Sequence, residues 1–129
     1  MNVLMSIKPK YFAKIARGEK RLELRKTLPM QNLPFKRPFW VYMYVSGTGE
    51  IRGAFLCDGF VLSNPSDIVA ALSCVSCAEL AGMCDRHGRV NGWKVGAVRI
   101  YRRPKHLADF GLERPPQSWR YTDFELDPD

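Results

Sequence analysis

A lysine, a glutamate and an arginine lie close together near the start of the chain, in the segment Gly18-Glu19-Lys20-Arg21-Leu22-Glu23-Leu24-Arg25. Glu23 and Arg25 are two residues apart, so on a strand their side chains lie side by side on one face. An arginine presents a fork of N–H donors that fits a phosphate or a base edge, and a carboxylate accepts from an exocyclic amino group. The spacing is therefore compatible with a site for a nucleotide-like ligand, with Lys20 pointing over it from the preceding turn.

The same three residues are compatible with two other interpretations. A lysine that is partly removed from water and lies beside other cations loses proton affinity, so Lys20 would serve as a general base with Glu23 orienting it or a water. Alternating charges are also ordinary on an exposed strand, where they form only weak surface ion pairs. The residues by themselves leave all three interpretations open.

The elements before this segment are predicted from short local signals. Residues 3–7 form an apolar run that favours a strand, and Pro9 suits the first position of a helix that runs to about Arg17. Gly18 is placed to adopt the left-handed conformation that ends a helix. Residues 21–25 alternate polar and apolar, which predicts a strand with Leu22 and Leu24 inward and the charged residues on the other face.

Positive charge is concentrated in the same part of the chain. The protein carries a formal net charge of +7 with a pI near 9.5, and residues 8–26 alone hold eight Lys or Arg against two Glu. Three of these cations share one helix face at positions i, i+4 and i+7. An anionic partner is therefore expected, such as nucleic acid, a nucleotide or an anionic membrane surface, and the charge alone does not choose among them. The expected contacts are Lys8, Lys10, Lys14, Arg17, Lys20, Glu23 and Arg25. A second basic cluster comprises Arg99, Arg102, Arg103 and Lys105.

The remaining pattern predicts one mixed α+β domain over residues 1–129. Strands are expected at residues 40–45, at residues 51–62 with interruptions at Gly53 and Gly59, and at residues 93–101. A short helical segment is expected through residue 72, and a capping box at Ser76 to Glu79 predicts a second helix to about Cys84. Three prolines predict an irregular C-terminal third. The element order favours a small closed or curled sheet with helices at its edge.

Aromatic residues at 40, 42 and 44 lie on one face of the strand at residues 40–45, where they would either stack on bases or enter the core. The opposite face of that strand is apolar too, which favours a core strand.

Cys74, Cys77, Cys84 and His87 resemble a four-ligand zinc spacing. Cys77 and Cys84 would lie about 10 Å apart along one helix, so a single zinc ion would have to break it. Buried thiols are therefore favoured, and no metal or cofactor is expected.

No apolar run approaches the roughly 20 residues that span a bilayer, and the start of the chain lacks the marks of a secretory signal. We therefore expect a cytosolic protein with no membrane partner.

The pattern Gly18-x-Lys20-x-x-Glu23-x-Arg25, preceded by Leu4-Met5-Ser6-Ile7-Lys8-Pro9-Lys10-Tyr11, resembles the ASCH domain, a family of PUA-like folds. The resemblance continues more weakly at Phe110-Gly111-Leu112 and at Pro115-Pro116-Gln117-Ser118-Trp119, which are similar to the tail of small bacterial and phage members. It implies a PUA-like β-barrel with a helix between the first two strands and a second helix at the edge.

The resemblance also implies a function. Members of this family are thought to bind RNA in a cleft beside the first helix, with the motif lining its floor, and one branch hydrolyses the acetyl amide of acetylated cytidine. That branch has threonine at the position of Glu23 and a further glutamate before the second helix, where this chain has Leu72-Ser73-Cys74-Val75. Lys20, Glu23 and Arg25 thus carry over as cleft residues. The resulting hypothesis is an RNA-binding protein, with an amidohydrolase using Lys20 and Glu23 as the alternative and a ribonuclease as a weaker one.

Overall fold

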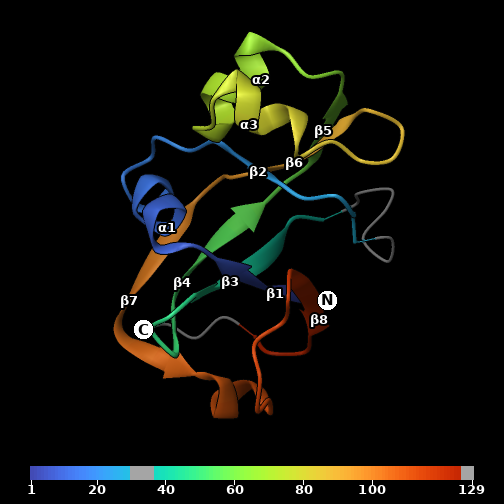
Figure 1. The fold of residues 1–129 in the computed structure, drawn as a ribbon. Coiled ribbons are helices and arrows are strands. Elements are labelled where there is room, and N and C mark those ends of the chain that lie inside the picture. The colour runs from blue at the N-terminus through green and yellow to red at the C-terminus, as the bar shows by residue number, and fades with distance from the viewer. Residues whose placement is uncertain (30–36, 126–129) are drawn as a thin grey trace.

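In the computed structural model, residues 1–29 and 37–125 are described, and they form two β-sheets with three short α-helices around them (Figure 1). The larger sheet has five strands in the order β7-β4-β3-β1-β8 and the smaller has three in the order β2-β6-β5. The strands are β1 (Asn2–Ile7), β2 (Leu22–Leu24), β3 (Phe39–Val45), β4 (Glu50–Cys57), β5 (Phe60–Ser63), β6 (Val90–Lys94), β7 (Val98–His106) and β8 (Trp119–Thr122). The predicted mixed α+β class is confirmed.

The helices begin where the sequence places their caps. α1 (Pro9–Ala16) starts at its proline, and Ser66 caps α2 (Asp67–Ser73) by accepting a hydrogen bond from the Val69 backbone N–H. The capping box at Ser76 is present, with both hydrogen bonds formed, at the start of α3 (Cys77–Ala81). The prediction that this helix runs to about Cys84 is wrong, because it ends at Ala81 and Gly82 takes the C-cap position.

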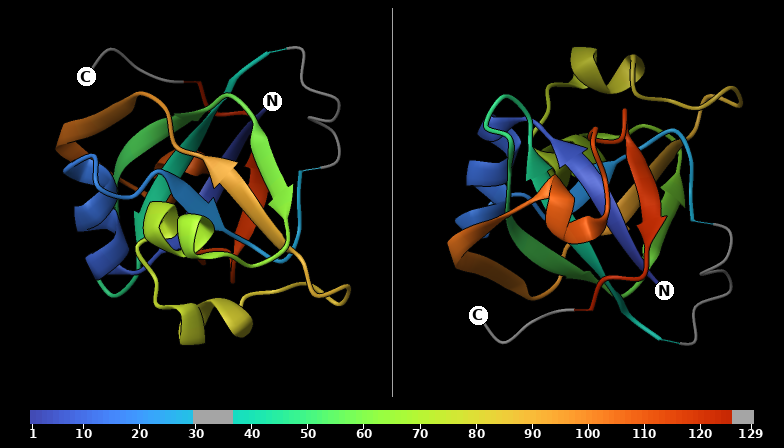
Figure 2. Two further views of the ribbon diagram at one scale, coloured as in Figure 1. Left: turned by 90° about the horizontal axis from the view of Figure 1, so that it is seen from above. Right: turned by 90° about the horizontal axis from the view of Figure 1, so that it is seen from below.

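The two sheets are joined where strands pass from one to the other. The predicted strand at residues 93–101 is in fact two strands, β6 in the smaller sheet and β7 in the larger. Between them, Gly96 donates a backbone hydrogen bond of 2.8 Å to the carbonyl of Leu56, and Leu56 donates one of 2.8 Å to Ala97. A Cβ at Gly96 would lie 2.9 Å from the Leu56 carbonyl oxygen, so this crossing requires glycine. Viewed from above, the strands wrap around a common interior (Figure 2).

The prediction of an irregular C-terminal third is wrong in part. β7 continues through Pro104 to His106, because β7 is an edge strand and the missing N–H of a proline breaks no ladder there. A short 3₁₀ helix, η2 (Leu107–Phe110), follows, and β8 then pairs antiparallel with β1. The last strand thereby forms one edge of the larger sheet.

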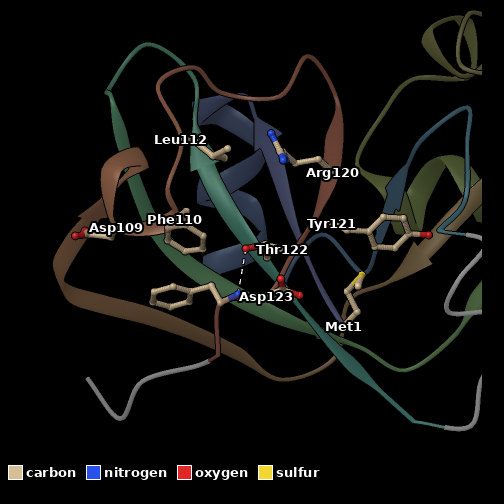
Figure 3. A pocket seen from close by; sticks show the side chains of 9 residues that line it. Met1, Asp109, Phe110, Leu112, Arg120, Tyr121, Thr122 and Asp123 are labelled. Atoms are coloured by element: carbon tan, nitrogen blue, oxygen red, sulfur yellow. Dashed lines mark hydrogen bonds between the residues drawn. The ribbon is translucent and has the colours of Figure 1, made fainter.

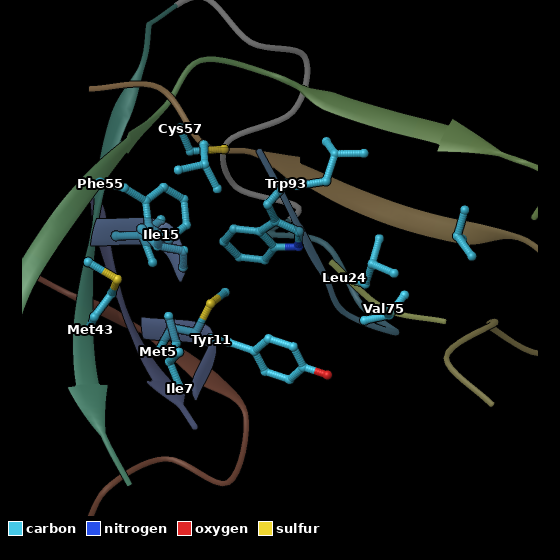
Figure 4. Close-up of a cluster of buried hydrophobic side chains, with 14 of the residues drawn as sticks. Met5, Ile7, Tyr11, Ile15, Leu24, Met43, Phe55, Cys57, Val75 and Trp93 are labelled. Carbon is cyan, nitrogen blue, oxygen red and sulfur yellow. The ribbon is translucent and has the colours of Figure 1, made fainter. Parts of the chain in front are cut away.

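Side chains of both sheets meet in one main core (Figure 4). Met5 and Met43 come from the larger sheet, Leu24 and Trp93 from the smaller, and Ile15 from α1. A second cluster on the other face of β3 surrounds Tyr42, which is fully buried and lies edge-on to Phe110 and Phe124. β3 is therefore a core strand, as its two apolar faces predict. Trp40 and Tyr44, half-buried against the second cluster, complete its packing.

Among the residues for which a structure is described, no helix has the length and apolarity needed to cross a membrane.

Candidate nucleotide-binding cleft

The turn after α1 sets the position of the charged motif. Gly18 has φ = +77°, as predicted for the residue that ends this helix, and its backbone N–H donates a 3.0 Å hydrogen bond to the carbonyl of Ile15. The Glu19 N–H donates to the carbonyl of Lys14 at 2.9 Å, which closes the turn. The chain then reverses over the end of α1, and Lys20 enters the interior before β2 begins.

Lys20 is almost fully buried, with 2% of its side chain exposed. Its ammonium donates a hydrogen bond to the backbone carbonyl of Ser73 at the end of α2 and lies 4.5 Å from the centre of the Tyr11 ring. Nζ is 3.9 Å from Oε2 of Glu23. Burial lowers the pKa of Lys20 from its usual value, and the nearby carboxylate of Glu23 opposes part of that shift.

Glu23 and Arg25 form a closer pair. The Arg25 guanidinium lies 3.2 Å from Oε1 of Glu23, whose side chain is 8% exposed. Nη2 of Arg25 also donates to the carbonyl of Ser6 at 2.8 Å, and Nη1 donates to Oγ of Ser118 at 3.1 Å. Arg25 therefore ties β2 to the end of β1 and to the segment before β8, which fixes the Glu23 carboxylate in place.

Two buried polar atoms of this pair have no hydrogen-bond partner among residues 1–29 and 37–125. They are Oε2 of Glu23 and Nε of Arg25. A buried polar atom left without a partner carries a desolvation cost of roughly 1–3 kcal/mol. Oε2 of Glu23 can therefore still accept a hydrogen bond, and Nε of Arg25 can still donate one.

The pair faces a cleft of about 500 Å³ between α1, the end of α3, β2 and the segment before β8. Tyr11, Leu24 and Met83 supply apolar wall, whereas hydroxyl, amide and cationic side chains supply the rest. Both Glu23 and Arg25 line it, but Lys20 does not. The full lining is Ser6, Lys8, Tyr11, Glu23, Leu24, Arg25, Lys26, Thr27, Ser46, Gly82, Met83, Gln117 and Ser118.

The sequence-based expectation that all three charged residues share one accessible cleft therefore needs a correction. Lys20 converges with Glu23 as expected, but the Tyr11 ring and the end of α2 enclose its ammonium. The outward face predicted for Glu23 is not a solvated face either, because Glu23 is buried beneath α1 and the cleft. The interpretation as weak surface ion pairs does not fit charges at this burial.

The basic residues of the first helix have different surroundings. Lys8 lines the cleft, and Lys10 lies exposed with its ammonium 4.8 Å from the Tyr11 ring centre. Lys14 is half-buried, and Arg17 forms a 2.9 Å ion pair with Glu19 at the surface. The predicted row of cations on one face of the first helix is thus present, and Arg17, the last of them, is already paired with Glu19.

Tyr11 is the residue of the site whose role the sequence did not reveal. Two lysine ammoniums, of Lys10 and Lys20, lie within 5 Å of its ring centre, and its hydroxyl is 3.5 Å from Oε2 of Glu79 on α3. Its position one helical turn before Ile15, which is buried, was the available signal. The carbonyls of Ser6 and Ser73 accept hydrogen bonds from Arg25 and Lys20. Every residue has a backbone carbonyl, so the sequence does not indicate which ones take this role.

A second cavity, of about 340 Å³, shares no lining residue with the cleft (Figure 3). It lies between η2, β8 and the start of β1, with Phe110, Arg120 and Tyr121 around it. None of the expected site residues lines it.

The four cysteines have separate neighbours, and the expectation of buried thiols holds only for Cys57, because Cys77 is exposed and Cys74 and Cys84 are half-buried. Cys57 is buried in the core, and burial raises its pKa to about 11. Cys74 lies beside the carbonyl of Glu19, Cys77 beside Asp67 and Cys84 beside the carbonyl of Leu80. Within the part of the chain that the structure describes, no three His, Cys, Asp or Glu side chains are grouped to hold a metal ion.

Comparison with known proteins finds similarity in structure but not in sequence. No protein-family model matches the chain, and no curated protein matches it. Among solved structures, the chain is similar to ASCH from Zymomonas mobilis, with a TM-score of 0.76 and 16% identity over 93% of this chain and 86% of that one. Two point mutants of the same Zymomonas protein match with TM-scores of 0.74 and 0.75, again at 16% identity and over 93% of this chain. The chain therefore has the fold of that ASCH protein, as the sequence motif predicted.

Proposed function

We propose that this protein binds RNA and holds one nucleotide of the strand in the cleft between α1 and β2. The observation that carries the proposal is the cleft itself. It places a buried carboxylate and a fixed guanidinium beside apolar wall, in a volume of about 500 Å³ that falls within the size range of small-molecule sites.

The chemistry of the lining suits a nucleotide. Glu23 accepts hydrogen bonds and therefore fits the amino groups of bases, while Lys8 and Lys26 at the cleft supply charge for phosphates. Tyr11 and Met83 offer apolar contact to a base or a sugar. The excess of positive charge over residues 8–26 would attract the strand and orient it.

Lys20 has an indirect part in this proposal. Because its ammonium is enclosed, we assign it to holding Glu23 and the end of α2 in place while adding positive potential beneath the cleft. Arg25 acts similarly through its three tethers, although it also lines the cleft.

A salt series tests the proposal. The logarithm of the affinity for single-stranded RNA should fall linearly with the logarithm of the salt concentration, because bound phosphates release counterions. Lys8→Gln combined with Lys26→Gln removes two cations from the cleft and should lower affinity by roughly three- to tenfold at low salt. Fluorescence anisotropy of a labelled RNA measures both effects.

The matched control removes two exposed cations elsewhere, with Arg37→Gln and Lys94→Gln. An equal loss in both variants, or an affinity that ignores salt, would contradict the cleft as the binding surface. Arg25→Ala and Lys20→Ala extend the series, provided that their melting curves first show folded protein, since both side chains anchor neighbouring elements.

Two observations support the second candidate, an amidohydrolase acting on a modified nucleoside such as acetylcytidine. The lowered pKa of Lys20 and its 3.9 Å distance from Glu23 are properties of a general base and its partner. Enclosure beneath Tyr11 counts against it, because a base must reach the proton that it abstracts. Incubation with acetylcytidine decides the matter: deacetylation abolished by Lys20→Ala favours the enzyme. Strand cleavage of RNA in a parallel incubation would point to a ribonuclease.

A further inference from the structure

The edge strand β7 carries the second concentration of positive charge. Its sequence from Val98 to His106 includes Arg99, Arg102, Arg103 and Lys105 and no carboxylate. Together with residues 8–26, it holds twelve of the 20 Lys and Arg but only two of the 13 Asp and Glu. The rest of the chain is therefore net acidic, and the excess of positive charge comes entirely from these two segments.

The pairing register between β7 and β4 shifts beside these side chains. Ile100 pairs with Gly53 and Lys105 pairs with Ile51, so β7 advances five residues while β4 advances two. The extra residues form a bulge, visible as the wide bend of β7 in Figure 1. Arg102 and Arg103 lie on this bulge, and both are exposed.

The other cations of the strand extend the basic surface along it. Arg99 is exposed and pairs in register with Ala54 of β4. The Lys105 ammonium lies 4.9 Å from the centre of the Tyr101 ring.

α1 connects this surface to the cleft. α1 packs against β7, as Figures 1 and 2 both show, and Lys8 and Tyr11 at its beginning line the cleft. Lys10 and Lys14 lie on the same helix. Cations therefore occupy three adjoining places, namely the cleft, α1 and the β7 bulge.

Charged residues on an edge strand also have a purely structural use, since they prevent pairing with the edge of another sheet. Here Pro104 and the bulge already disrupt the edge, so pairing is obstructed without the arginines. The number of cations exceeds what protection of the edge requires.

We propose that the β7 bulge, through Arg102 and Arg103 with Arg99 beside them, binds phosphates of the same RNA strand whose nucleotide occupies the cleft. This inference rests on the proposed function. It makes the ligand an extended single strand that passes from the cleft across α1 to the edge of the larger sheet, rather than a free nucleotide.

The experiment compares Arg102→Gln/Arg103→Gln with the equally charged control Arg37→Gln/Lys94→Gln, whose residues lie on neither α1 nor β7. Each variant and the wild type are titrated with a trinucleotide and with a single-stranded RNA of about 20 nucleotides, a length beyond the site of most single-strand folds. Loss of two phosphate contacts should reduce the slope of log affinity against log salt by about 1.4. It should lower affinity for the long RNA by roughly five- to twentyfold at low salt, with the trinucleotide unaffected.

Equal losses in the β7 variant and the control would overturn the inference, because net charge alone would then explain them. Unchanged binding of the long RNA by the β7 variant would overturn it as well, while leaving the cleft proposal intact. Failure of the wild type to bind either RNA would overturn both. Binding of the wild type to phosphatidylserine vesicles but not to RNA, lost in the β7 variant, would assign the surface to a membrane instead.

Discussion

Among single residues, the main result is how differently the three charged groups of the motif are used. Glu23 and Arg25 face the cleft, whereas Lys20 lies beneath Tyr11 and holds the carbonyl of Ser73. The residue types were evident from the sequence, and so was their proximity. Their accessibility was not, because it depends on the Tyr11 ring of α1 and on the backbone at the end of α2, which together enclose Lys20.

Cys57 provides a prediction about pH. Its folded pKa is raised to about 11 by burial, above the ordinary value of 9.0. The unfolded chain therefore loses this thiol proton first, so the free energy of unfolding should fall as pH rises from about 9 to 11. The fall attributable to Cys57 is on the order of 2–3 kcal/mol.

Urea unfolding of the wild type and of Cys57→Ala at several alkaline pH values measures this fall in the free energy of unfolding. The substitution lowers stability at every pH through the cavity it leaves, but it should flatten the alkaline decline. Parallel declines in the two proteins would show that another group is responsible.

At the level of helices and strands, the turn between α1 and β2 determines whether Lys20, Glu23 and Arg25 come together. Gly18 ends the helix in the left-handed conformation, and the next residues deliver Lys20 to the interior. The sequence predicted this turn because the signal is local: a glycine directly after an amphipathic helix. The C-terminal end of α3 and the division between β6 and β7 were missed. Backbone hydrogen bonds to Leu56, which is distant in sequence, decide where these two strands divide.

Gly18 therefore gives the second prediction. No atom lies within 4 Å of a Cβ built at this position, so a substitution meets backbone strain alone. Gly18→Ala should lower the free energy of unfolding by about 1–2 kcal/mol, and Gly18→Asn by less, because asparagine tolerates the left-handed region. Thermal or urea unfolding gives the order of the three proteins. An alanine variant as stable as the wild type would mean that the turn relaxes to another conformation.

At the level of the whole molecule, the two sheets share one core. Trp93 of the smaller sheet is fully buried and contacts Phe39 of the larger sheet and Trp119 of β8 edge-on. The cleft lies where these sheets and α1 meet, so the geometry of the site depends on the packing of both.

The third prediction follows from that shared core. Unfolding should be a single transition, coincident by tryptophan fluorescence and by far-UV circular dichroism, because the main core is built from side chains of both sheets. Trp93→Leu should lower the urea midpoint by an amount that corresponds to roughly 2–4 kcal/mol and keep the two signals coincident. Separate transitions for the two signals would indicate that the sheets unfold independently.

The sequence by itself determined the features that depend on neighbours a few residues apart. These are the starts of α1, α2 and α3, the end of α1 at Gly18, the core strand β3 and the grouping of positive charge. Each arises from caps, alternation or helical spacing, which act over one or two turns of chain.

Only the tertiary structure decided which charged group meets the ligand and which is enclosed. Ser73 lies 53 residues from Lys20, and Ser118 lies 93 residues from Arg25. Burial at such distances is set by how helices and strands pack together, and the packing of distant segments has no signature in the local pattern of residues.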